Sequence, residues 1–162
     1  MYQYSSKLKA ALAAAAISLC SSGIALAAPK PYLHTGLTCL EVGYMGDQLS
    51  CIYVGGHTVP KVGSGFYENE AVYIYLRLRE LPPGKHTIRA SYHRREFGAN
   101  QYSLAKTQKV TFSNTSPGWI KTFQAPAEAR TPGNYIIKLH LDNQVFLGEI
   151  RYCVSQTCFL EG

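Results

Sequence analysis

Histidines are the residues of this chain that would most readily bind a metal or carry proton transfer. Of the five histidines, His86 and His93 lie seven residues apart, and on one strand an odd separation points two side chains to opposite faces. The others fall in separate segments, with no H-x-H or H-x-x-x-H spacing. We therefore expect loop or surface imidazoles and predict no metal site. These other histidines are His34, His57 and His140.

Hydrolytic chemistry would need an activated nucleophile or a pair of carboxylates. Ser64 lies in VGSGF, which does not match the G-x-S-x-G elbow of α/β-hydrolases. Glu68 and Glu70 share a face if their segment is extended, as a glycosidase pair would. A solvated strand edge explains them better, because a glycosidase also needs a substantial cleft. We predict that the protein is not an enzyme and needs no cofactor.

The first residues have the layout of a bacterial secretory signal peptide. Lys7 and Lys9 precede an apolar run over residues 10–19, and small residues follow up to Ala27. Ten apolar residues form a helix of only about 15 Å, too short for a stable membrane anchor. We expect cleavage near Ala27 and a mature protein that is periplasmic or secreted.

Residues 28–162 are long enough for a single domain. Without the leader's two lysines, 14 Lys and Arg face 10 Asp and Glu, for a net charge of 14 − 10 = +4. This mild excess suits anionic partners but falls short of the dense basic patches of nucleic-acid-binding proteins. We expect no nucleic-acid partner.

Four cysteines remain beyond the leader, and an even number in an exported chain indicates two disulfides. In CLEVGYMGDQLSC, pairing the two ends about Met45 sets Cys39 opposite Cys51, and Cys153 and Cys158 would then close a short loop. Crossed pairings are equally compatible with the sequence. The C-x11-C and C-x4-C spacings fit no zinc site.

The stretch AVYIYLRLRELPPGKHTIRASYHRR, residues 71–95, alternates apolar and polar residues on both sides of a Pro-Pro-Gly turn. Period-two alternation is typical of half-buried strands. It predicts a hairpin with one apolar and one polar face. A two-residue loop would place Arg79 opposite Ile88 and mix these faces, so the connection needs an odd number of residues or a bulge.

Further strands are predicted near residues 37–42, 49–54, 107–112, 118–124, 135–141 and 145–154, with no long helix. Asp142 and Asn143 supply a turn in the last hairpin, and Gly148 marks a bulge that restores the alternation. Seven or eight short strands at these intervals predict an all-β, antiparallel β-sandwich.

The run GNYIIKL, residues 133–139, resembles the start of strand F in immunoglobulin-like domains. The resemblance covers about residues 70–154 and is shared by many bacterial modules of this class. It implies that Tyr135 is the residue of a tyrosine corner, that Ile137 replaces the second core cysteine, and that strand G begins near Val145. The chain differs from antibody domains in lacking their central cysteine pair.

The polar face of the 71–95 hairpin is the strongest candidate binding site. In the predicted ladder Arg77 pairs with Arg89, and such opposed cations repel unless an anion intervenes. Tyr and Arg are also enriched at interfaces. We expect a non-catalytic module that binds an envelope protein or an anionic glycan. An ordinary solvated face, a structural subunit of a surface or secretion assembly, and a secreted enzyme inhibitor with residues 93–103 as its loop are the alternatives. The candidate residues are Tyr73, Tyr75, Arg77, Arg79, Arg89, His93 and Arg95.

Overall fold

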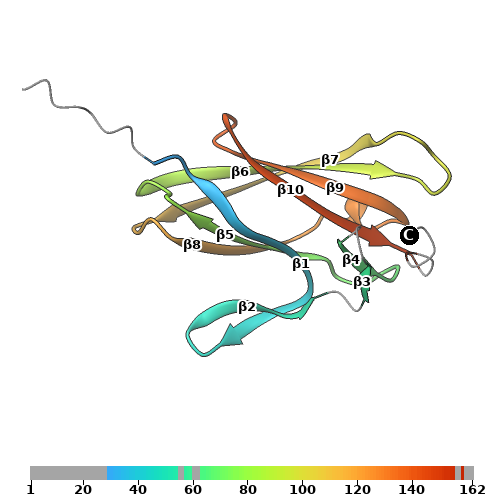
Figure 1. Ribbon diagram of the computed structural model, residues 1–162, viewed down its shortest axis with the longest axis horizontal. Coiled ribbons are helices and arrows are strands. Elements are labelled where there is room, and N and C mark those ends of the chain that lie inside the picture. Colours follow the sequence, from blue (N-terminus) through green and yellow to red (C-terminus); the bar gives the residue numbers. More distant parts are fainter. Residues whose placement is uncertain (1–28, 55–56, 60–62, 156–157, 159–162) are drawn as a thin grey trace, which may run out of the picture.

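The protein is a sandwich of two β-sheets, and a computed structural model describes residues 29–54, 57–59, 63–155 and 158 (Figure 1). The all-β prediction is confirmed. The strands are β1 Tyr32–Met45, β2 Gln48–Val54, β3 His57–Val59, β4 Gly63–Phe66, β5 Tyr73–Arg79, β6 Gly84–Arg95, β7 Ser103–Asn114, β8 Trp119–Gln124, β9 Gly133–Leu141 and β10 Val145–Val154, and a short 3-10 helix, η1, covers Ala127–Ala129. Among the described residues, no helix has the length and apolar character to cross a membrane.

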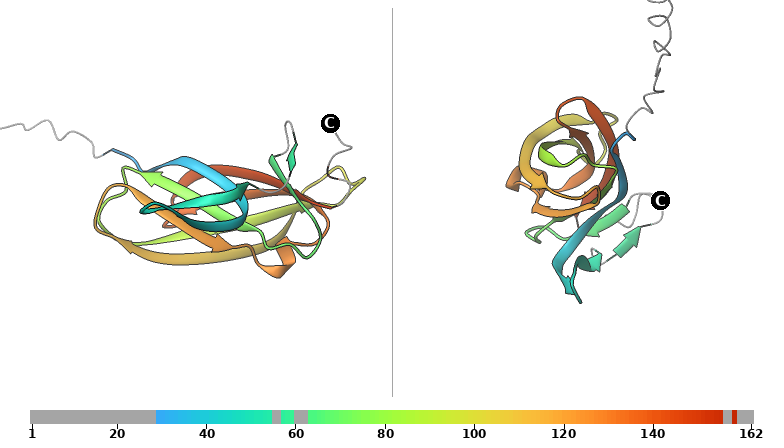
Figure 2. Two further views of the ribbon diagram at one scale, coloured as in Figure 1. Left: turned by 90° about the horizontal axis from the view of Figure 1, so that it is seen from below. Right: turned by 90° about the vertical axis from the view of Figure 1, so that its left-hand side faces the viewer.

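One sheet has the order β2-β1-β5-β8 and the other has the order β3-β4-β10-β9-β6-β7. Figure 2 shows the two layers wrapped around a shared interior. Alternate residues of the central strands supply that interior, because successive side chains of a strand point to opposite faces. Its fully buried members include Ile74, Leu76, Leu78, Ile88, Tyr92, Ile137, Leu139 and Tyr152.

The strand order is that of an immunoglobulin-like sandwich. Strands β1, β5 and β8 occupy the places of A, B and E, while β10, β9, β6 and β7 occupy those of G, F, C and C′. Strand β4 runs parallel to β10, in the place of A′. The generic immunoglobulin-like resemblance is thus confirmed.

The tyrosine corner lies at the start of β9, as the resemblance implied. The Tyr135 hydroxyl donates a hydrogen bond to the backbone oxygen of Thr131 over 2.7 Å. The Tyr135 ring stacks on Tyr152, with centroids 4.7 Å apart, and Tyr152 bonds to the Ala129 carbonyl. These contacts fasten the connection from β8 to β9 onto the core.

The predicted β5–β6 hairpin is wrong. Strand β5 pairs with β1 and β8, whereas β6 pairs with β7 and β9 in the other sheet. Between them the chain crosses the sandwich as an arch, where Glu80 has a φ of 56° and Leu81 is fully buried. The arch removes the conflict between the two alternations, because strands that do not pair need no common register.

The last hairpin is confirmed. Strands β9 and β10 are antiparallel, with a register shift between Phe146 and Gly148. This shift is the bulge that the sequence indicated. Asp142 and Asn143 form the turn, with φ values of 49° and 61°.

Both cysteine pairs are local. The Cα atoms of Cys39 and Cys51 lie 5.6 Å apart and those of Cys153 and Cys158 lie 5.8 Å apart, within the range for disulfides. The expected ladder position was wrong, because register shifts beside Glu41 place Cys51 opposite Val42. The predicted signal peptide, residues 1–27, lies outside the described residues.

Candidate functional site

The seven candidate residues do not form one face, because β5 and β6 belong to different sheets. Tyr73, Tyr75, Arg77 and Arg79 alternate with the inward-facing residues of β5 and lie on the outer side of the four-stranded sheet, where Tyr75 is nevertheless buried. Arg89, His93 and Arg95 lie on the outer side of the six-stranded sheet. The predicted pairing of Arg77 with Arg89 is therefore wrong, since the two sheets separate them.

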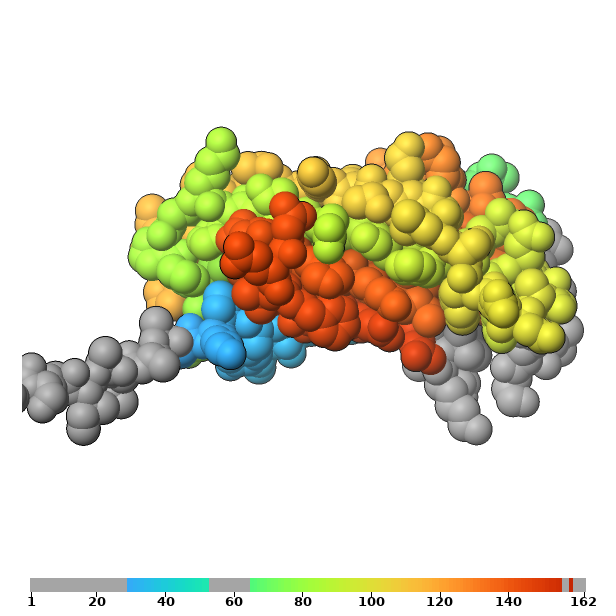
Figure 3. All heavy atoms as spheres, turned by 90° about the horizontal axis from the view of Figure 1, so that it is seen from above, coloured from blue at the N-terminus to red at the C-terminus, as the bar shows by residue number. Residues whose placement is uncertain are grey.

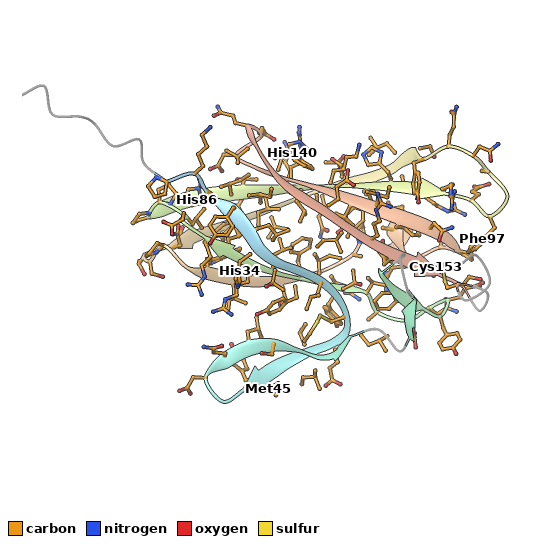
Figure 4. The ribbon with its side chains drawn as sticks, viewed as in Figure 1. His34, Met45, His86, Phe97, His140 and Cys153 are labelled. Carbon is orange, nitrogen blue, oxygen red and sulfur yellow. A yellow bond between two sulfur atoms is a disulfide. The ribbon has the colours of Figure 1, made fainter. Side chains whose placement is uncertain are left out.

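Arg77 and Arg79 instead line a pocket of about 400 Å³ on the four-stranded side. One wall is the tip of the β1–β2 hairpin, which Figure 1 shows extending beyond the sandwich and Figure 4 marks with Met45. The other wall consists of the C-terminal end of β5 and the start of β8. The volume lies within the range of small-ligand sites. The lining residues are Tyr44, Asp47, Gln48, Leu49, Arg77, Leu78, Arg79, Gly118, Trp119 and Ile120.

Local sequence explains both walls of the pocket. Gly46 has a φ of 63°, which glycine adopts without steric cost, so the chain reverses tightly between Met45 and Asp47. On the sheet side, Arg77 lies opposite Ile120 in the β5–β8 ladder. Residues paired across a ladder share a face, so both side chains point outward toward the hairpin.

The pocket lining has an excess of positive charge. It contains the guanidinium groups of Arg77 and Arg79 and the carboxylate of Asp47, for a net charge of 2 − 1 = +1. Within the part of the chain that the structure describes, neither guanidinium group makes a hydrogen bond or an ion pair. Both guanidinium groups thus keep their donors available for a carboxylate or phosphate, which they bind in a two-pronged geometry.

Aromatic rings complete the pocket. Trp119 stacks on Phe112 of the other sheet, with ring centroids 3.4 Å apart and planes 18° from parallel. This contact joins the indole to the core, on the inward side of β8 that Trp119 shares with its ladder partner Leu78. Tyr44, on the opposite wall, is 75% exposed. The exposed phenol of Tyr44 and the outward side chain of Ile120 offer apolar surface beside the two cations.

A partly buried ion pair lies outside this pocket, and spacing in the sequence gave no sign of it. The His86 Nδ1 is 2.7 Å from Asp142 Oδ2, and its Nε2 is 2.8 Å from the Pro82 carbonyl oxygen. His86 is only 8% exposed. His93 does point to the opposite face of β6, as predicted.

The environment of His86 favours its charged form. Burial lowers the pKa of His86, but the hydrogen bond to Asp142, the bond to the Pro82 carbonyl and the charge of Asp142 together outweigh burial and raise the pKa above 6.5. Both ring nitrogens face acceptors, and only the imidazolium can donate to both. The cluster joins the β5–β6 arch to the β9–β10 turn. Among the described residues, no group of three His, Cys, Asp or Glu side chains is placed to hold a metal ion.

The loop expected of an inhibitor joins β6 to β7. Figure 4 shows Phe97 at the end of the sandwich opposite to His86. Phe97 and Tyr102 are exposed, and the Arg95 guanidinium lies 5.4 Å from the centroid of the Tyr102 ring. Arg95 therefore belongs to this loop end and is far along β6 from Arg89.

No family model and no curated protein matches this sequence. Among solved structures, an immunoglobulin-like protein from Pseudomonas aeruginosa aligns over 79% of this chain and 98% of its own, with 8% identity and a TM-score of 0.43. A β-glucosidase from Listeria innocua, solved with gluconolactone, aligns over 68% of this chain with 12% identity and a TM-score of 0.40. The chain spans only 18% of that enzyme's length. The fold assignment rests on the strand order and the tyrosine corner.

Proposed function

We propose that the protein is an exported, non-catalytic binding module that holds an anionic glycan of the cell envelope in the pocket beneath the β1–β2 hairpin. The observation that carries the proposal is the pair of guanidinium groups, Arg77 and Arg79, that line the pocket without a protein partner among the described residues. Charged donors held in a concave site are typical of carboxylate and phosphate recognition.

The rest of the lining suits a sugar. Tyr44 offers ring surface to the apolar side of a pyranose, and Asp47 and Gln48 offer hydrogen-bonding groups to its hydroxyls. The proposal is for binding because Asp47 is the one carboxylate among the lining residues, whereas glycoside hydrolysis uses two.

Export is supported by the two cysteine pairs at disulfide distance. Disulfides persist in oxidising compartments such as the bacterial periplasm. Mass spectrometry of the protein recovered from its native cells tests this part directly. We expect an N-terminus near Ala28 and a mass lower by four hydrogens than that of the reduced chain, and a full-length reduced protein would contradict export.

Calorimetric titration with uronic-acid oligosaccharides, and with their carboxyl-reduced neutral forms, tests the ligand class. We expect the acidic forms to bind and Arg77→Gln or Arg79→Gln to weaken binding roughly 10- to 100-fold, the usual loss for a hydrogen bond to a charged group. Arg77→Lys should keep more of the affinity than Arg77→Gln but less than the unchanged protein, because lysine keeps the positive charge but lacks the planar, two-pronged donor geometry of the guanidinium group.

Lys121→Gln is the matched control. Lys121 lies next to Ile120 on β8 but points to the other side of the strand, opposite Leu76. The Lys121→Gln substitution removes one positive charge from β8, the strand beside β5, without changing the pocket lining. Equal binding of acidic and neutral sugars, or equal losses in Arg77→Gln and Lys121→Gln, would refute the proposed site.

A further inference from the structure

The outer side of the six-stranded sheet forms a second basic surface, separate from the pocket. Figure 3 shows strands β10, β9, β6 and β7 side by side on this side of the molecule. By the strand registers, six Lys or Arg side chains and one carboxylate, Glu149, lie on it. We call this surface the basic face: Lys85, Arg89, Arg95, Lys109, Lys138 and Arg151.

The centre of the basic face places like charges directly against one another. Arg89 lies opposite Lys109 on β7 and opposite His140 on β9. Like charges in directly opposed positions destabilise a sheet. Arg89, Lys109 and Lys138 form no ion pair within the described residues, and Glu149 lies 3.8 Å from Arg151.

The positive charge of the basic face acts on the pKa of His93, which lies on the same outward side of β6. Burial lowers the pKa of His93, and the charge of Lys138 lowers it further, against a smaller opposing effect of Glu149. Glu149, opposite Lys138 in the β9–β10 ladder, is the one carboxylate among the described residues of this face. An external anion would relieve the repulsion between Arg89 and Lys109.

Exposed apolar side chains stand among these cations. Phe146 lies opposite His140, with the two rings 5.3 Å apart, and its side chain is 55% exposed. Leu104 lies opposite His93 and is 60% exposed. Both point outward with the basic residues, from strands at either side of the face.

We propose that the basic face docks the protein onto an anionic lipid bilayer. Charge complementarity selects a negative partner, and the cations are spread over four neighbouring strands, which suits a surface of phosphate headgroups better than a single narrow chain. Basic residues bind such surfaces additively. Phe146 and Leu104 are side chains of the kind that enter the headgroup region beside cations.

The test is co-sedimentation of the mature protein with vesicles of 30% phosphatidylglycerol in phosphatidylcholine, compared with phosphatidylcholine alone. Lys109→Glu reverses one charge and sets an acid opposite Arg89, so it should not weaken the fold. At about fivefold per unit of charge, we expect partitioning to fall about 25-fold. Lys121→Glu reverses one charge on the other sheet, at a half-buried position opposite Leu76. With its fold verified by circular dichroism, it should stay within about twofold of the unchanged protein.

A second arm separates a bilayer from a soluble polyanion. Phe146→Ser should weaken vesicle binding roughly tenfold by removing buried apolar surface, and should leave binding to dextran sulfate unchanged. Failure to sediment with the anionic vesicles would overturn the proposal, as would equal losses in Lys109→Glu and Lys121→Glu. Vesicle binding that is insensitive to Phe146→Ser would also overturn it, in favour of a soluble anionic polymer.

Discussion

The hydroxyl of the tyrosine corner should stabilise the fold measurably. Tyr135→Phe removes one hydroxyl, which donates to the Thr131 backbone oxygen over 2.7 Å and lies 2.9 Å from the Thr131 hydroxyl. The ring remains, so its stacking on Tyr152 is kept. Loss of the hydrogen bond to the partly buried carbonyl and of the contact with the Thr131 hydroxyl should lower the free energy of unfolding by about 1 to 2 kcal/mol.

Urea unfolding of the oxidised protein measures this loss, and it should appear as a lower midpoint with an unchanged slope. The matched control is Tyr75→Phe. Tyr75 is also largely buried, at 8% exposure, but its hydroxyl makes no hydrogen bond among the described residues. The control should stay within about 0.5 kcal/mol of the unchanged protein. If the two variants lose the same stability, the hydroxyl bond at the corner does not stabilise the fold and the argument is wrong.

The remaining predictions concern the buried histidine, the disulfides and one glycine. Since the pKa of His86 is raised above 6.5 in the folded protein, His86 stabilises the fold fully below pH 6.5, and this stabilisation is lost as the pH rises through the pKa of the folded state. Urea unfolding between pH 5.5 and 8.5 should show this decrease in the free energy of unfolding in the unchanged protein, and a smaller decrease in His86→Gln. Serine replacement of Cys39 and Cys51, separated by 12 residues, should cost about 3 kcal/mol, against about 2 kcal/mol for Cys153 and Cys158, separated by 5; the opposite order in thermal unfolding would contradict the loop-length argument. Gly133→Ala should lower Tm by several degrees, because Gly133 has a φ of 150° and an added Cβ would lie 2.9 Å from the Arg95 carbonyl oxygen; a Tm equal to that of the unchanged protein would contradict this strain.

Alternation predicted which side chains face the core but not which strands pair. Ile74 and Ile88 were correctly placed on inward faces, and both are fully buried. A proline-rich turn, however, can close a hairpin within one sheet or an arch between two, and both leave the same pattern of polar and apolar residues. The β9–β10 hairpin was predictable because Asp142 and Asn143 also supply the positive φ values that its turn needs.

The pocket could not be predicted, because it depends on contacts between distant segments. The sequence marked Arg77 and Arg79 as unusual on an outward face, but Tyr44 and Asp47 lie more than 25 residues earlier in the chain. Their approach depends on how far the β1–β2 hairpin bends over the sheet. The same applies to His86 and Asp142, which are 56 residues apart and meet because β6 lies beside β9.

The two proposed surfaces lie on opposite layers of the sandwich, and this determines how they could act together. Packed sheets lie about 10 Å apart, and the core between them is continuous, so the layers should move as one body. A protein that lies on a bilayer through the basic face would therefore turn the β1–β2 hairpin and its pocket away from the membrane (Figure 1). Bilayer binding would hold the pocket open toward envelope glycans, and neither contact would obstruct the other.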